Sequence, residues 1–295
     1  MGLARAQQDA LSFDALSSRE PVSASPANAT ILPAIVTFWR GPLDRLRLTC
    51  LRSQVAAGHK VTVYSFDPIP GLPDGVDHAD AEAVLPRSFS EKLRPPRPDG
   101  SWRDWTTLQF SDFFRIRLMA RGAGLWLDAD VLLLKPIKID PAKPFFARER
   151  GRQLGNSVLY LPTDDPIVQA FEALMEQEEL TPDWLSLRHR VTFALRRMRG
   201  DCNRLSDIRV AIYGPAALTA LAQRAGSSRD ALPKKSFYAV HSEPKLFFEP
   251  ADFSKYLSDP GIIGLHISPK GRGNTVPVPG SLYAWAAERF GSASP

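Results

Sequence analysis

Apolar positions along the chain alternate between short β-type runs and helical repeats. Residues 34–39 form an apolar run that ends in the turn Arg40-Gly41-Pro42. Apolar residues then recur at helical spacing over 43–58, and a second apolar run covers residues 60–66. A strand, a helix and a strand in this order predict a βαβ unit with parallel strands.

Further elements follow the same alternation. The pattern predicts a helix over 105–121 with apolar residues on nearly every side, which is typical of a buried helix. It also predicts strands over 154–161 and 262–267, and helices over 165–179, after Tyr213-Gly214-Pro215 and over 282–290. Residues 67–100 predict short helical pieces separated by prolines, and the Arg-rich residues 182–207 have no clear pattern. We therefore expect an α/β protein with a central, mostly parallel sheet flanked by helices.

Two aspartates interrupt the most apolar run of the chain. Residues 125–127 and 131–134 are apolar, and Asp128 and Asp130 lie between them. Because buried charges need a partner, we expect this pair where the strand emerges at the carboxyl edge of the sheet, beside a cation. Residues i and i+2 of a strand face the same way, so both carboxylates can bind one hard ion, Mg²⁺ or Mn²⁺. A turn with two solvated acids is the alternative.

The predicted helix over 105–121 carries a second charged pair. Asp112 and Arg115 are three positions apart and are therefore neighbours on the helix surface. Spacing alone leaves two interpretations open: a structural ion pair, or one residue that binds a ligand while the other orients it.

Composition indicates one catalytic domain of ordinary globular character. The 295 residues are 44% hydrophobic and 23% charged, with a net charge of +5. This charge suits an anionic ligand or an acidic membrane surface, and no nucleic-acid-binding signature is present. Cys50 and Cys202 are the two cysteines, which favours a reducing compartment. We expect a flexible leader over 1–30, one domain over 31–291 with helical insertions near 67–105 and 163–207, and a tail over 292–295. A cytoplasmic location fits, with peripheral association at the inner membrane face.

The run Ser111-Asp112-Phe113-Phe114-Arg115, followed by Gly122-Ala123-Gly124-Leu125-Trp126-Leu127-Asp128-Ala129-Asp130, resembles the signature of DXD glycosyltransferases with the GT-A fold. The chain is most similar to glycosyltransferase family 32, which includes Och1-type mannosyltransferases, lactosylceramide α-1,4-galactosyltransferases and capsular polysaccharide synthesis enzymes, and more distantly to clostridial glucosylating toxins. The similarity is strong over 111–136 and extends in order to the first strand, to residues 214–219 and to Leu265-His266. Gly122-Ala123-Gly124 departs from the Gly-Gly common in the family.

The resemblance implies a role for each matching residue. Trp39 corresponds to the aromatic residue on which uracil stacks, and Asp112 and Arg115 correspond to the pair that contacts the donor sugar. Asp128 and Asp130 correspond to the metal ligands, and Asp128 also corresponds to a residue that contacts the ribose or sugar of the donor. His266 corresponds to a late metal ligand. Asn156 lies where the family places acceptor or sugar contacts, with a buried capping residue as the alternative. The chain beyond His266 has no clear match in the family. From the residues alone, Lys270 and Arg272, which flank Gly271, are expected to add positive charge near the diphosphate, with a solvated basic loop as the alternative.

The resemblance also implies a reaction. It is the metal-dependent transfer of a hexose from a nucleotide-sugar, a UDP-sugar as the best match, to a glycan or lipid acceptor, with retention of configuration. Mn²⁺ or Mg²⁺ is the implied cofactor, and bacterial surface polysaccharide or glycolipid synthesis is the implied setting. Two alternatives remain: an aspartyl-phosphate phosphatase that uses Asp128 and Asp130, and a non-catalytic nucleotide-sugar-binding module. The phosphatase motif has Thr or Val two places after its second Asp, where this chain has Leu132.

Overall fold

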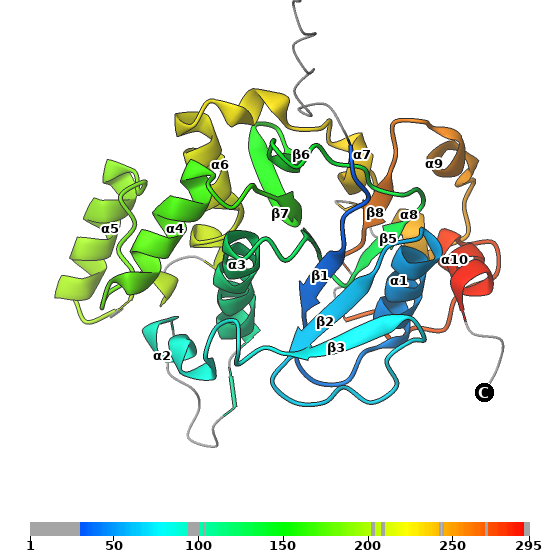
Figure 1. Ribbon diagram of the computed structural model, residues 1–295, viewed down its shortest axis with the longest axis horizontal. Coiled ribbons are helices and arrows are strands. Elements are labelled where there is room, and N and C mark those ends of the chain that lie inside the picture. The colour runs from blue at the N-terminus through cyan, green and yellow to red at the C-terminus, as the bar shows by residue number, and fades with distance from the viewer. Residues whose placement is uncertain are drawn as a thin grey trace, which may run out of the picture.

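The protein is an α/β molecule built on a six-stranded sheet (Figure 1). The computed structural model describes residues 30–93, 101–102, 104–201, 204–207, 210–241, 243, 245–268 and 271–291. The predicted leader, except Thr30, and the predicted tail lie outside these residues. In the described residues, no helix combines the length and the apolar character needed to cross a bilayer.

The sheet has the strand order β3-β2-β1-β4-β7-β6. β1 pairs in parallel with β2 and β4, and β2 pairs in parallel with β3, whereas β7 runs antiparallel to both β4 and β6. The strands are β1 (Ile35–Phe38), β2 (Val61–Ser65), β3 (Val76–Asp80), β4 (Leu125–Leu127), β6 (Phe145–Arg150) and β7 (Gln153–Tyr160). The predicted mostly parallel α/β architecture is confirmed.

A second, two-stranded antiparallel sheet joins β5 (Val131–Leu133) to β8 (Gly264–His266). The longer helices are α1 (Arg45–Ala56), α3 (Asp104–Ala120), α4 (Pro166–Glu176), α5 (Leu187–Met198), α6 (Pro215–Arg224) and α10 (Leu282–Phe290). The short helices are η1 (Arg87–Phe89), α2 (Ser90–Leu93), η2 (Leu205–Asp207), η3 (Val210–Ile212), η4 (Ser227–Asp230), α7 (Lys235–Tyr238), α8 (Lys245–Phe248) and α9 (Ser254–Ser258).

The alternation of side chains along the strands divides the core into two faces. Val36 and Trp126 point to the face covered by α3, whereas Ile35 and Leu125 point to the face that holds β5 and part of α1. Because both faces are covered, the central strands β1 and β4 are apolar at nearly every position and fully buried.

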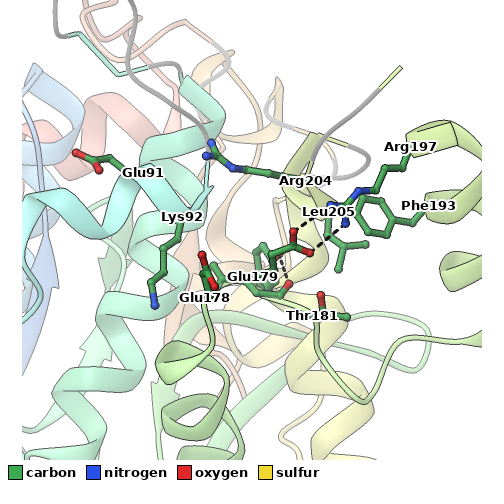
Figure 2. A pocket seen from close by; sticks show the side chains of 11 residues that line it. Glu91, Lys92, Glu178, Glu179, Thr181, Phe193, Arg197, Arg204 and Leu205 are labelled. Atoms are coloured by element: carbon green, nitrogen blue, oxygen red, sulfur yellow. Dashed lines mark hydrogen bonds and ion pairs between the residues drawn. The ribbon is translucent and has the colours of Figure 1, made fainter. Parts of the chain in front are cut away.

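A layer of helices extends the molecule on the α3 side of the sheet. α4 packs against α3, and α6 packs against β7. α5 lies beyond α4 at the outer edge of the molecule (Figure 1). A cavity of about 500 Å³ lies between α2, the segment that follows α4, and α5, with Lys92, Glu179 and Arg197 among its lining residues (Figure 2).

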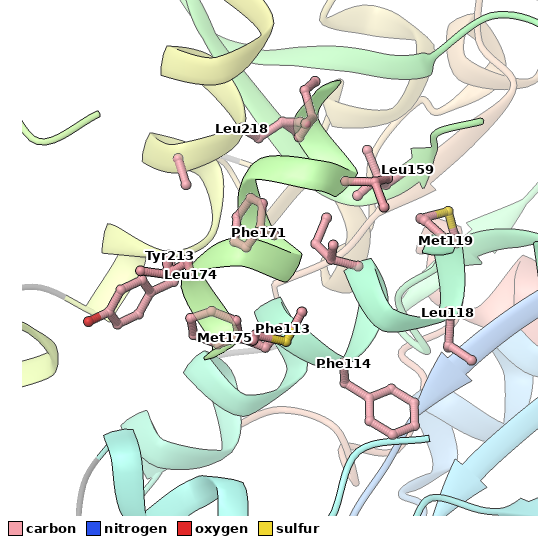
Figure 3. Packing of buried hydrophobic residues seen from close by; sticks show 14 of the residues in the cluster. Phe113, Phe114, Leu118, Met119, Leu159, Phe171, Leu174, Met175, Tyr213 and Leu218 are labelled. Atoms are coloured by element: carbon pink, nitrogen blue, oxygen red, sulfur yellow. The ribbon is translucent and has the colours of Figure 1, made fainter. Parts of the chain in front are cut away.

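The core on this side is rich in aromatic residues (Figure 3). Phe113 packs against Phe171 of α4 with ring centroids 5.8 Å apart and against Tyr213 at 4.9 Å. Phe114 packs against Phe38 of β1 at 4.8 Å. α3 therefore fixes the helical layer and the central strand relative to each other.

Several strand predictions need correction. Residues 67–100 contain the edge strand β3 as well as helical pieces, and β6 is an additional strand that pairs with β7. The apolar residues 125–134 form two strands in different sheets instead of one interrupted strand. The predicted strands over 34–39, 60–66, 154–161 and 262–267 are confirmed as β1, β2, β7 and β8.

Two helix predictions also need correction. α3 is not buried on every side, because Trp105 and Leu108 are 41% and 54% exposed. Residues 182–207, for which no pattern was clear, contain the regular helix α5. The predicted helices over 43–58, 165–179 and 282–290 and the helix after Tyr213-Gly214-Pro215 are confirmed as α1, α4, α10 and α6.

Candidate metal and donor site

The two aspartates lie in a tight turn between the two sheets. β4 ends at Leu127, and the chain turns over residues 128–130 before β5 begins. The backbone N–H of Asp128 donates to the carbonyl of Ser157 at 2.8 Å, and the carbonyl of Asp130 accepts from the backbone N–H of Ile267 at 3.0 Å. The turn, and not the side-chain alternation of a strand, therefore brings both carboxylates together at the carboxyl end of β4.

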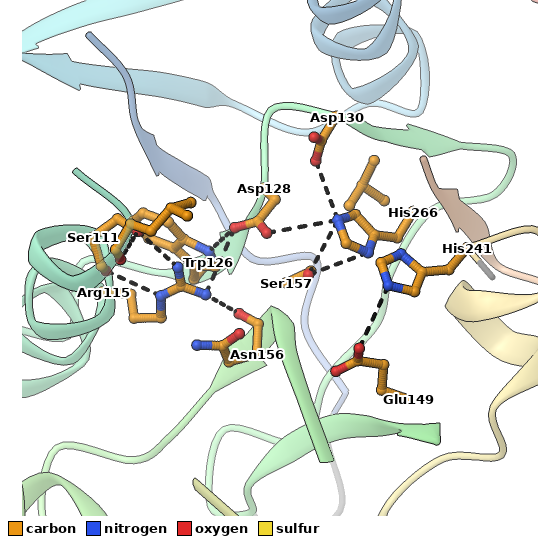
Figure 4. Close-up of polar contacts among 12 residues, drawn as sticks. Ser111, Arg115, Trp126, Asp128, Asp130, Glu149, Asn156, Ser157, His241 and His266 are labelled. Carbon is orange, nitrogen blue, oxygen red and sulfur yellow. Dashed lines mark hydrogen bonds and ion pairs between the residues drawn. The ribbon is translucent and has the colours of Figure 1, made fainter. Parts of the chain in front are cut away.

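His266 completes a cluster of three potential metal ligands (Figure 4). It lies at the end of β8, opposite Val131 in the antiparallel register. Its Nε2 is 3.3 Å from Oδ1 of Asp130 and 3.9 Å from Oδ2 of Asp128, and the ligand atoms of all three residues lie within 4.8 Å of one another. Two carboxylates and an imidazole fit a divalent cation of the Mn²⁺ type, so the cluster can bind a metal ion.

The charges in this cluster stabilise one another. Burial alone would raise the pKa of Asp130, but the hydrogen bond and charge of His266, together with the charge of Arg47, hold this pKa below its usual value. Burial alone would lower the pKa of His266, but the hydrogen bond from its ring to Asp130 and the nearby carboxylates raise this pKa above its usual value. Without a metal, the imidazole therefore holds a proton between the two acids over a wider pH range than a free histidine.

One arginine approaches each aspartate. Nη1 of Arg115 is 3.7 Å from Oδ1 of Asp128, and Nη2 of Arg47 is 3.4 Å from Oδ2 of Asp130. Arg47 also pairs with Asp44, which caps the N-terminus of α1. Arg47 was not predicted from the sequence. It lies in the first turn of α1, the helix that follows β1 after a short loop, and anionic ligands commonly bind at such helix N-termini.

A group of polar residues behind His266 was also missed. The imidazole ring of His266 stacks on the ring of His241, with centroids 4.6 Å apart and an interplanar angle of 14°. Nε2 of His241 is 3.4 Å from Oε1 of Glu149 (Figure 4). Ser157 lies 3.3 Å from both ring nitrogens of His266. These neighbours restrict the orientation of the imidazole, as outer-shell groups do for metal ligands.

Asp112, Arg115 and Asn156 form one buried network. Oδ1 of Asp112 accepts a hydrogen bond from the side-chain amide of Asn156 at 2.8 Å and lies 3.4 Å from Nη2 of Arg115. Arg115 also donates to the carbonyl of Asn156 and stacks on Trp126, with its guanidinium carbon 4.5 Å from the ring centroid. A Cβ atom at Gly214 would come within 2.6 Å of the carboxylate of Asp112, so a glycine is needed there.

All three members of the network are buried, but they differ in their contact with the cleft. Arg115 lines the cleft beside Asp128, whereas Asp112 and Asn156 are not among its lining residues. Direct contact of Asp112 or Asn156 with a donor sugar therefore stays a prediction. In this structure both residues orient Arg115.

We expect Asp112→Asn to change how the stability of the metal-free protein depends on pH. Burial raises the pKa of Asp112 to about 6, despite the opposing effect of Arg115. Between about pH 4 and pH 6 the folded state therefore keeps a proton that the unfolded state has released, so this group lowers stability as the pH rises through that window. The free energy of unfolding of the variant relative to wild type should rise by about 3 kcal/mol from about pH 4 to about pH 7. Urea unfolding at a series of pH values measures it.

Asp77→Asn provides the control for this measurement, because its carboxylate is 59% exposed on the edge strand β3. This variant is measured over the same series of pH values. A difference between Asp112→Asn and wild type that stays constant with pH would rule out the burial of a costly charge at position 112.

A cleft of about 780 Å³ runs past both acids. Trp39, Arg47, Ser111, Arg115, Asp128 and Asp130 are among its lining residues. Trp39 is half-buried at the end of β1, and the guanidinium carbon of Arg47 lies 4.6 Å from the centre of its ring. Leu108 also lines the cleft, which explains why this apolar position of α3 is exposed.

The segment after β8 also reaches the cleft. Gly271 and Ser268 line the cleft. Lys270 lies outside the described residues, and Arg272 pairs with Glu249 at 3.8 Å and packs over Phe248.

No protein-family model and no curated protein matches this sequence. Among solved structures, the chain is similar to one described as "PaToxG Glycosyltransferase", with a TM-score of 0.41 and 15% identity, over 66% of this chain and 70% of that chain.

Proposed function

We propose that this protein is a metal-dependent glycosyltransferase that uses a nucleoside-diphosphate sugar. The observation that carries the proposal is the cluster of Asp128, Asp130 and His266, with one arginine on each aspartate, beside a cleft that Trp39 also lines. The DXD signature described above matches the same two aspartates.

The site offers a complementary group for each part of such a donor. Asp128, Asp130 and His266 would hold a divalent cation, which supplies positive charge to a diphosphate. The guanidinium groups of Arg47 and Arg115 can bind phosphate oxygens in the same cleft. Trp39 presents an aromatic surface for a base, and base stacking of this kind contributes ~1–3 kcal/mol per base.

In the transfer step, the bond between the anomeric carbon and the diphosphate oxygen breaks, and the leaving diphosphate takes the electron pair. An acceptor hydroxyl forms the new bond to the same carbon and transfers its proton to the oxygen of the leaving diphosphate. Arg47 and Arg115 offset the negative charge that grows on the leaving oxygens. We propose UDP as the nucleotide, a hexose as the sugar and retention of configuration, on the strength of the sequence resemblance.

The remaining parts of the proposal also come from the sequence. We propose a single catalytic domain over residues 31–291, a glycan or lipid acceptor, and a role in bacterial surface polysaccharide or glycolipid synthesis at the cytoplasmic side of the membrane. Mn²⁺ is the proposed ion, with Mg²⁺ as the alternative.

A panel of nucleotide-sugars tests this function. We expect slow, Mn²⁺-dependent hydrolysis of one UDP-hexose in the absence of an acceptor, loss of this activity in EDTA, and its return when Mn²⁺ is added in excess. Release of phosphate from p-nitrophenyl phosphate, with no nucleotide-sugar turned over, would instead identify the phosphatase. Tight binding of UDP with neither activity would identify a binding module.

A further inference from the structure

Helix α5 carries an apolar stripe that faces solvent. Leu187, Val191, Leu195 and Met198 are 77%, 49%, 47% and 84% exposed. At 3.6 residues per turn these positions, together with Ala194, fall within an arc of about 100° on one side of the helix. No residue of α5 is buried. A helix with an apolar stripe normally turns it towards the core, so this orientation needs another explanation.

Arginines border this stripe on both sides. Helical spacing places Arg188 and Arg199, the residue that caps the helix, along one border and Arg190 and Arg197 along the other. The helix, with the sequence LRHRVTFALRRM, contains no acidic residue. Within the part of the chain that the structure describes, neither Arg188 nor Arg199 forms an ion pair with a carboxylate.

Phe193 on the far side of α5, and Arg190 and Arg197 on one border of the stripe, attach the helix to the body of the protein. Phe193 packs against the large core cluster. Arg190 donates to the carbonyls of Leu185 and Asp183 at 3.1 and 2.7 Å, and Arg197 forms two hydrogen bonds of 3.0 Å with Glu179 (Figure 2). These contacts hold the helix so that the stripe faces away from the protein.

We propose that α5 is a membrane-docking helix that binds the surface of a bilayer containing anionic phospholipids. The stripe would enter the boundary between headgroups and acyl chains, and Arg188 and Arg199 on its border would contact lipid phosphates, which is the arrangement of interfacial amphipathic helices. The net charge of +5 favours the same partner. A second copy of the chain fits less well, because a symmetric contact between two α5 stripes would bring arginines of both copies together without a facing carboxylate on either helix.

This surface is separate from the proposed donor site. None of the α5 residues named here lines the cleft beside Asp128 and Asp130. Membrane binding can therefore be measured without any assumption about catalysis, and failure of one proposal would leave the other standing.

Sedimentation of the full chain with vesicles tests the proposal. We expect binding to vesicles of phosphatidylcholine with 30% phosphatidylglycerol and at least tenfold weaker binding to pure phosphatidylcholine. Leu187→Ala/Leu195→Ala/Met198→Ala removes most of the stripe but keeps good helix formers, so its partition coefficient should fall about tenfold or more. Arg188→Gln/Arg199→Gln should lower the partition coefficient by a similar factor, because each basic residue near an anionic surface raises this coefficient several-fold.

The matched control is Val276→Ser/Val278→Ser, which changes two other exposed apolar residues, 68% and 41% exposed, outside α5. It should bind like wild type, and circular dichroism should show the same helix content in all variants. The proposal would be overturned if wild-type protein bound equally to vesicles with and without the anionic lipid, or if the stripe variants bound as tightly as wild type. An equal loss of vesicle binding in the control variant would also overturn it. Vesicle-independent dimerisation that the stripe variant abolishes would assign the stripe to a second copy instead.

Discussion

Replacing Asp130 by asparagine is expected to reduce metal-dependent turnover by about a thousandfold or more, because one ligand charge is lost at the point where the diphosphate must be neutralised. The change keeps the volume of the side chain. In the variant Arg47 keeps its ion pair with Asp44, and His266 keeps the carboxylate of Asp128 at 3.9 Å, so neither cation is left without a partner. We therefore expect the fold and the melting temperature of the metal-free protein to change little.

Two measurements on one preparation check this prediction. The first is nucleotide-sugar hydrolysis at saturating Mn²⁺. The second is the rise in melting temperature that Mn²⁺ produces, which reports binding to the folded state and should be lost in the variant. Asp77→Asn, the exposed carboxylate on β3, should behave like wild type in both. Normal turnover by Asp130→Asn would remove this residue from the metal site.

The central fold could be predicted because its signal is local. β1, β2 and β4 are rich in apolar and β-branched residues, and the second half of β7 is apolar. α4 carries a regular apolar face that is buried as expected. β3 gave no such signal, because this edge strand has the sequence VDHAD and is mostly exposed. A strand whose partners lie on one side only does not need an apolar pattern.

The exposed apolar residues of α3 and α5 could not be predicted for a different reason. Leu108 looked like a core residue by spacing, but the side of α3 on which it lies borders the cleft. The stripe of α5 follows helical spacing, yet it belongs to no core. Periodicity shows which residues share one side of a helix, but it does not show what that side contacts.

The candidate site could be predicted where the residues lie close in sequence. Asp128 and Asp130 are two positions apart, and Asp112 and Arg115 are one helical turn apart, so their pairing was visible in the chain. Arg47 and Asp130 are separated by 83 residues, and they meet because α1 packs against β5. His241 reaches His266 through α7, which packs on β8. Contacts of this kind depend on the packing of helices against strands, which a single sequence does not specify.

Mn²⁺ binding is expected to weaken as the pH falls, by about tenfold per pH unit once the pH is below the pKa of His266. The neighbouring carboxylates raise this pKa above its usual value, and an imidazole must lose its proton before it can bind a metal. Asp130 has a lowered pKa and stays ionised over the same range, so a single proton should be released on binding. The slope of log affinity against pH should therefore be close to one in weakly acidic solution and close to zero in alkaline solution.

The free energy of unfolding of the metal-free protein should fall as the pH rises, whereas the Mn²⁺ affinity should increase. Because the folded state raises the pKa of His266, the proton contributes stability that is fully present below the pKa of the unfolded chain and is lost as the pH rises through the folded value. The increase in melting temperature produced by a fixed Mn²⁺ concentration should consequently be larger at about pH 8 than at about pH 6. His266→Gln, which cannot titrate, should show weaker binding at alkaline pH and a slope lower by one proton. A slope that is identical in wild type and His266→Gln would mean that this imidazole does not bind the ion, and that the aspartates alone hold it.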